Sequence, residues 1–242
     1  MSTKPQDTGA AAGAAGNAPC RNNTAASAAV TGAPVRVVFL GNSITLHPVK
    51  PSIGWLNEWG MAASAADKDY VHIVTRGIER ETGRKADVRV RNLADFERGF
   101  KEYDFSREKD LHDFDPDILV VALGENVAEL DSGEERLAFR DAFKRLLAGF
   151  MRERSTPLAV VRGVFWKSEW KDAMMAHAAS DFSIPFVPIS DLKEDDPSMQ
   201  ALGLFEHAGV AAHPGDKGMA AIAARILEFL FTNVRINGKP LH

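Results

Sequence analysis

Three short and almost continuous runs of apolar residues stand out along the chain. They cover residues 35–40, 117–123 and 157–162, and a glycine follows each run. Apolar, largely β-branched runs of this length between turn residues are typical of strands that are buried on both faces. We therefore expect three central strands of a parallel sheet.

Two further segments have weaker strand patterns. Residues 88–91 alternate between valine and arginine, which predicts a strand nearer the edge of the sheet. Residues 184–189 are apolar but contain Pro185 and Pro188. Because proline has no N–H group to donate to a neighbouring strand, these prolines weaken the pattern of this fifth predicted strand.

Apolar residues with helical spacing fill the gaps between these strands. The predicted helices cover residues 60–82, 133–153, 169–180 and 215–232. Gly83 is a plausible stop for the first helix, and Pro214 suits the first turn of the last. Strands that alternate with helices predict an α/β fold, a three-layer α/β/α sandwich around a doubly wound, mainly parallel five-stranded sheet.

The first 33 residues differ from the rest of the chain. They are small and polar and include almost no large apolar side chain. Such a segment buries too little surface to offset the entropy of ordering. We predict a disordered low-complexity tail over residues 1–33 and one folded domain over residues 34–242.

Composition and charge exclude several classes of partner. The formal net charge is −4, so no basic surface for nucleic acid is expected. No run of 18 apolar residues occurs, which argues against a membrane span. The single Cys20 permits no intramolecular disulfide, and residues 1–33 do not form a complete signal peptide. The expected location is cytoplasmic, or exported with the leader absent from this sequence.

Ligands of doubly wound sheets bind beyond the carboxyl ends of the strands, so the residues that follow the strands matter most. Ser43 follows the first strand and is expected to expose its hydroxyl at the mouth of the sheet. Asn126 follows the strand at 117–123, where its amide would be able to donate to an oxyanion. Serine and asparagine also cap helices and turns, which is the structural alternative for both residues.

His213 stands directly before Pro214 and the predicted last helix. The positive end of a helix dipole lowers the pKa of a histidine, and the neutral imidazole is the form that a general base needs. The alternative is an ordinary surface histidine.

Taken in order, Gly41-Asn42-Ser43, Gly124-Glu125-Asn126 and His213-Pro214 resemble the motifs of the SGNH hydrolases, also called GDSL esterases. The resemblance covers roughly residues 35–235. It implies that Ser43 is a nucleophile and His213 its general base. It also implies an oxyanion hole made by the Ser43 backbone N–H, the Asn126 side chain and a backbone N–H from the loop 92–97. The implied chemistry is acyl transfer through an acyl-enzyme, with neither a metal nor a cofactor.

The sequence departs from this family pattern at two positions near the strand ends. Asn42 replaces the usual aspartate, as in several carbohydrate-active relatives, and is a candidate substrate contact. Glu97 stands where the family glycine would fall, so its backbone N–H is the expected third oxyanion donor. The Glu97 carboxylate either binds a polar substrate or pairs with Arg98 or Arg91.

A third departure concerns the acid of the catalytic triad. The family places this acid three residues before the histidine, where this chain has Val210. Glu206, seven residues before His213, is one candidate acid if residues 208–212 form an extra loop. The other possibility is a Ser-His dyad in which a backbone carbonyl orients the ring.

Two tryptophans near the predicted site suggest the class of substrate. Trp55 and Trp166 are expected to stack on sugar rings, although both would also serve as core residues. The leading hypothesis is a serine esterase that removes O-acetyl or other short acyl groups from a glycan or small-molecule ester. The alternatives are an O-acyltransferase with the same Ser-His site and a catalytically impaired glycan-binding protein.

Overall fold

The computed structural model describes residues 32–151 and 156–237. The predicted tail therefore lies outside the described residues except for residues 32 and 33, and it stays a prediction. Five parallel strands form one sheet in the order β2-β1-β3-β4-β5. Their bounds are β1 Val35–Gly41, β2 Ala86–Asn92, β3 Ile118–Ala122, β4 Leu158–Arg162 and β5 Phe186–Val187.

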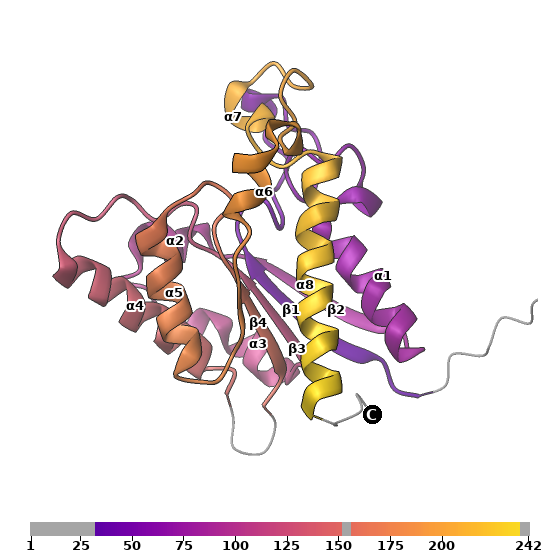
Figure 1. Ribbon diagram of the computed structural model, residues 1–242, viewed down its shortest axis with the longest axis vertical. Helices are drawn as coiled ribbons and strands as arrows, with labels where there is room; N and C mark the ends of the chain where they lie inside the picture. The colour runs from indigo at the N-terminus through magenta and orange to yellow at the C-terminus, as the bar shows by residue number, and fades with distance from the viewer. Residues whose placement is uncertain (1–31, 152–155, 238–242) are drawn as a thin grey trace, which may run out of the picture.

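Helices cover both faces of this sheet (Figure 1). Alternate residues of a strand point to opposite faces, so Val37 and Phe39 of β1 enter one core while Val38 and Leu40 enter the other. The first core is closed by α1 Tyr70–Thr82 and α8 Asp216–Asn237. The second core is closed mainly by α4 Gly133–Ala148 and α5 Glu169–Ser180. The predicted three-layer α/β/α sandwich is thus confirmed.

Several predicted boundaries shift. The helix predicted from residue 60 begins only at Tyr70, because the buried Asp69 caps it by accepting a 2.8 Å hydrogen bond from the His72 backbone N–H. The helix predicted over 133–153 ends at Ala148. The stop at Gly83 is confirmed, since this residue adopts φ 65°.

The connection between β2 and β3 contains two short helices that the sequence pattern did not predict. They are α2 Ala94–Gly99 and α3 Lys109–Phe114, and they add Phe96 and Leu111 to the second core. At the far edge, β5 has only two residues because prolines flank it on both sides.

Beyond the carboxyl ends of the strands lies a layer of loops and short helices. It includes α6 Ser190–Asp195 and α7 Ala208–Ala211, near the top of Figure 1. Its 3-10 segments are Pro51–Ile53, Ala66–Lys68 and Pro197–Met199, and a fourth, Phe105–Glu108, precedes α3. A small apolar cluster holds this layer together: Trp55, Met61, Ala62, Ala201 and Val210.

The longest helix, α8, has 22 residues. Across the ranges that the structure describes, neither α8 nor another helix is both long enough and apolar enough to cross a membrane.

Candidate active site

Ser43 lies in a sharp turn directly after β1. Gly41 pairs with both neighbouring strands, opposite Asn92 and Ala122, and the chain then folds back so that the Asn42 carbonyl accepts from the Thr45 N–H at 2.9 Å. A Cβ on Gly41 would lie 1.8 Å from Thr45 Oγ1. Only glycine fits there, and the turn places Ser43 at the carboxyl edge of the sheet.

Ser43 and His213 form a hydrogen-bonded pair. Ser43 Oγ lies 2.8 Å from His213 Nε2, and His213 Nδ1 lies 2.7 Å from the Gly209 carbonyl oxygen. A carbonyl only accepts hydrogen bonds, so Nδ1 carries the proton and donates it to Gly209. The neutral ring then has a free lone pair on Nε2, which accepts the Ser43 O–H.

The surroundings of His213 favour the neutral ring. Burial lowers the pKa of His213, and its hydrogen bond to the Gly209 carbonyl opposes this effect only in part. Trp166 packs edge-on against the imidazole, with ring centroids 5.3 Å apart and an interplanar angle of 84°. A neutral imidazole within 2.8 Å of a serine hydroxyl is arranged as a general base.

The structure does not bring Glu206 to the imidazole. Glu206 is exposed and lines a neighbouring cavity with Pro51 and Phe205. Among the described residues no hydrogen bond or ion pair involves its carboxylate. Val210, at the position of the family acid, is fully buried in the apolar cluster around Trp55. Of the two alternatives left open by the sequence, the backbone carbonyl is the one that contacts Nδ1.

Glu97 is a buried acceptor beneath the site. Its Oε1 accepts from Asn42 Nδ2 at 3.0 Å and from the Gly124 N–H at 2.5 Å, while its Oε2 accepts from Asn126 Nδ2 at 2.6 Å. Its backbone N–H donates to the Leu93 carbonyl inside α2. The expectation that this N–H is the third oxyanion donor is therefore wrong. Of the two alternatives for the carboxylate, the described residues show no pairing with Arg98 or Arg91, and the side chain is buried.

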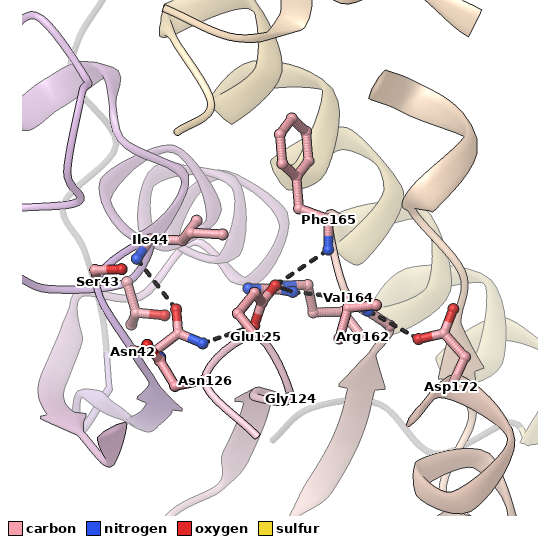
Figure 2. Close-up of polar contacts among 12 residues, drawn as sticks. Asn42, Ser43, Ile44, Gly124, Glu125, Asn126, Arg162, Val164, Phe165 and Asp172 are labelled. Carbon is pink, nitrogen blue, oxygen red and sulfur yellow. Dashed lines mark hydrogen bonds and ion pairs between the residues drawn. The ribbon is translucent and has the colours of Figure 1, made fainter. Parts of the chain in front are cut away.

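Asn42 joins two loops beneath the serine (Figure 2). Its Nδ2 donates to Glu125 Oε2 at 2.6 Å, and its Oδ1 accepts from the Ile44 N–H at 3.2 Å. Glu125 in turn accepts from Arg162 and from the Phe165 N–H. Asn42 is fully buried and supports the turn that carries Ser43. The expectation that it contacts the substrate is therefore wrong.

The charges under the site do not balance locally. Arg162, fully buried at the end of β4, forms an ion pair with the buried carboxylate of Glu125. The nearby Glu97 has no cationic partner of its own in the described part of the chain. Burial raises the pKa of Glu97, and the negative charge of Glu125 raises it further. The three hydrogen bonds from Asn126, Asn42 and Gly124 oppose both effects.

Two groups beside Ser43 remain able to stabilise an oxyanion. The Ser43 backbone N–H has no acceptor within the described ranges. Asn126 Nδ2 uses one hydrogen for Glu97, while Asn126 Oδ1 accepts from Arg98 at 3.1 Å. The second hydrogen of this amide is left for a ligand, and Asn126 lines the same cavity as Ser43 and His213.

This cavity has a volume of about 570 Å³. Trp55 does not line it: the side chain is fully buried and donates its indole N–H to the His47 carbonyl at 3.2 Å. Trp55 is therefore a core residue, which was the alternative to stacking on a sugar ring. Trp166 is half-buried; its ring packs against His213, and it lines a separate surface hollow together with Lys167 and Trp170.

Two contributors to this site were not identified from the sequence. Gly209 acts through its carbonyl oxygen, which no side-chain pattern reveals. Arg162 does leave a signal, because a charged residue at the end of an apolar run of β4 needs a buried partner.

Comparisons with known proteins address the fold. No protein-family model matches the sequence, and no curated protein matches it. A solved two-domain esterase active on acetylated mannans superposes with a TM-score of 0.53 at 20% identity, covering 82% of this chain and 49% of that one. The chain thus spans about half the length of that esterase.

Two other solved structures match over nearly their whole length. A lipase/acylhydrolase from Enterococcus faecalis has a TM-score of 0.53 at 16% identity, with coverage of 86% of this chain and 99% of that one. An acetyl xylan esterase has a TM-score of 0.51 at 13% identity, with coverage of 81% and 99%. The chain therefore shares the fold of these esterases, and that of a solved GDSL-like lipase from Bacteroides uniformis, which has a TM-score of 0.52 at 18% identity with coverage of 82% and 96%.

Proposed function

We propose that this protein is a carboxylic ester hydrolase with Ser43 as nucleophile and His213 as general base. The observation that carries the proposal is the pair of contacts made by the imidazole. Nε2 lies 2.8 Å from Ser43 Oγ and Nδ1 lies 2.7 Å from the Gly209 carbonyl, which fixes both the orientation and the tautomer of the ring.

The reaction follows from this tautomer. His213 Nε2 takes the hydroxyl proton as Ser43 Oγ attacks the ester carbonyl carbon, and the carbonyl oxygen becomes an oxyanion. Collapse of this intermediate breaks the bond to the alcohol, which leaves with the proton from Nε2. Water, deprotonated by the same Nε2, then attacks the acyl-enzyme; the bond to Ser43 Oγ breaks, the acid leaves, and the proton on Nε2 returns to Oγ.

The oxyanion is stabilised by the Ser43 backbone N–H and by Asn126 Nδ2. Fixed donors aimed at a developing charge contribute strongly because they need no reorganisation during the reaction. Glu97 fixes the Asn126 amide by accepting its other hydrogen at 2.6 Å. Glu97 is thus a positioning residue, which acts on the reaction through Asn126.

The proposed substrate is a carbohydrate that carries O-acetyl or other short acyl groups. Solved proteins of similar fold include an esterase active on acetylated mannans and an acetyl xylan esterase. Trp166, whose ring contacts His213 and which is partly exposed in the separate hollow, offers an aromatic surface for a sugar ring.

Hydrolysis of 4-nitrophenyl acetate and of acetylated xylo-oligosaccharides tests the proposal. Ser43→Ala and His213→Ala are each expected to lower kcat by about 10³-fold or more. Ser106→Ala and His177→Ala, at exposed positions, serve as matched controls and should retain wild-type rates.

Equal release by the wild type and the Ser43→Ala variant would refute the esterase. Oligosaccharide binding without any turnover would favour the glycan-binding alternative. Transfer of the acetyl group to an added sugar, in preference to water, would favour the acyltransferase.

A further inference from the structure

The mouth of the active-site cavity carries positive charge without matching negative charge. Lys50 and Arg98 line the cavity together with His47, and both cationic side chains are exposed. The one carboxylate on the lining is that of Asp95. The chain as a whole has a net charge of −4, so this local excess of positive charge runs against the overall composition.

The ion pairs around the cavity increase this imbalance. Asp95 is already paired with Arg107, at 3.5 Å. Arg98 donates one hydrogen bond, to the neutral Asn126 side chain at 3.1 Å. Across residues 32–151 and 156–237, neither Arg98 nor Lys50 forms an ion pair with a carboxylate. The guanidinium of Arg98 and the ammonium of Lys50 therefore have N–H groups available to bind a ligand.

Lys50, Arg98 and His47 line one and the same cavity. Burial lowers the pKa of His47, and the nearby positive charges of Lys50 and Arg98 lower it further. Arg98 also contacts Asn126, an oxyanion donor of the proposed reaction. An anionic group held by Arg98 would thus lie close to the ester that Ser43 attacks.

We propose that the substrate is an acylated acidic carbohydrate, whose carboxylate or sulfate group binds between Lys50 and Arg98. This inference rests on the proposed esterase function and names its substrate class. An arginine matches the planar, two-oxygen edge of such anions, and a lysine adds a mobile point charge.

The experiment compares acetate release from three acetylated oligosaccharides of similar length: oligogalacturonides, sulfated galactans and neutral xylo-oligosaccharides. The kcat/KM of the wild type should be higher on one or both acidic substrates by about 10-fold, and this preference should shrink as salt is raised to about 0.5 M. A higher kcat/KM on oligogalacturonides would identify the bound group as a carboxylate, and a higher value on sulfated galactans would identify it as a sulfate.

Variants locate the preference. Lys50→Ala should raise KM on the acidic substrate about 3- to 10-fold, with little change on the neutral one. Arg98→Gln removes the charge together with the hydrogen bond to Asn126, so it should raise KM on the acidic substrate and lower kcat on both substrates. Lys101→Ala, whose ammonium is paired with Glu135 at 3.1 Å, is the matched control.

A binding measurement separates this inference from the proposed function. Calorimetry of the Ser43→Ala variant with non-acetylated oligogalacturonides and sulfated galactans should show binding that Lys50→Ala weakens. Turnover with no preference for either acidic substrate would overturn the inference and leave the esterase intact. Binding that depends on Lys50 without any turnover would uphold the anion site and refute the esterase.

Discussion

Glu97 accepts a 2.6 Å hydrogen bond from Asn126 Nδ2, from beneath the cavity that Asn126 lines with Ser43. In the proposed reaction, this contact fixes an oxyanion donor. Because Glu97 is buried and makes only acceptor contacts, a glutamine there would place an N–H₂ group against existing donors. We expect Glu97→Gln to lower kcat about 10- to 100-fold, with little change in KM.

The matched control for this prediction is Glu102→Gln, which changes an exposed carboxylate just beyond α2. Thermal unfolding of both variants separates catalysis from stability. A Glu97→Gln protein that is folded and has wild-type kcat would contradict the positioning role of Glu97.

The fold could be predicted because its signals are local. The apolar runs of β1, β3 and β4 and the glycines after them follow from burial and turn geometry. The predicted start of α1 lies ten residues before the observed one, since a hydrogen bond between two ends of the segment 60–69 holds it outside the helix. There the Gly60 N–H donates to Asp69 Oδ2 at 3.1 Å.

The site was predictable only in part. Ser43 and His213 were identified by their order along the chain, and the structure brings them together. The roles expected for the Glu97 backbone, Asn42 and Trp55 were wrong, because each depends on which way a group points. Whether a buried side chain faces a core or a cavity is set by long-range packing, which a sequence pattern does not contain.

A second prediction follows from the hydrogen bond between His213 and the Gly209 carbonyl. The Gly209 carbonyl orients the ring, and Glu206 is exposed on a neighbouring cavity. We therefore expect Glu206→Gln to keep kcat within about 2-fold of the wild type, as do most surface substitutions away from a site. Steady-state kinetics on 4-nitrophenyl acetate provides the measurement, and a loss of 100-fold would instead identify Glu206 as the missing acid.

The pH profile of the reaction follows from the environment of His213. Burial lowers the pKa of this imidazole below its ordinary value of 6.5, and the general base must be neutral. The value of kcat/KM should therefore rise with pH, with its inflection below pH 6.5, and stay constant at higher pH. The same inflection should persist in His47→Gln, which assigns it to His213. An inflection above pH 7 would contradict the burial of the ring.

The turn that presents the nucleophile should tolerate no side chain at Gly41. A methyl group there would collide with Thr45 Oγ1, which forms a 2.7 Å hydrogen bond with the buried Tyr70 hydroxyl. Because the collision lies between β1 and the serine, relief of the strain has to move one of them. We expect Gly41→Ala to lower the free energy of unfolding by about 1–3 kcal/mol and to abolish most esterase activity. Gly99→Ala is the matched control, since a Cβ at Gly99 meets no atom within 4 Å. Urea unfolding and ester hydrolysis measure both effects, and a Gly41→Ala protein with unchanged stability and rate would refute this account of the turn.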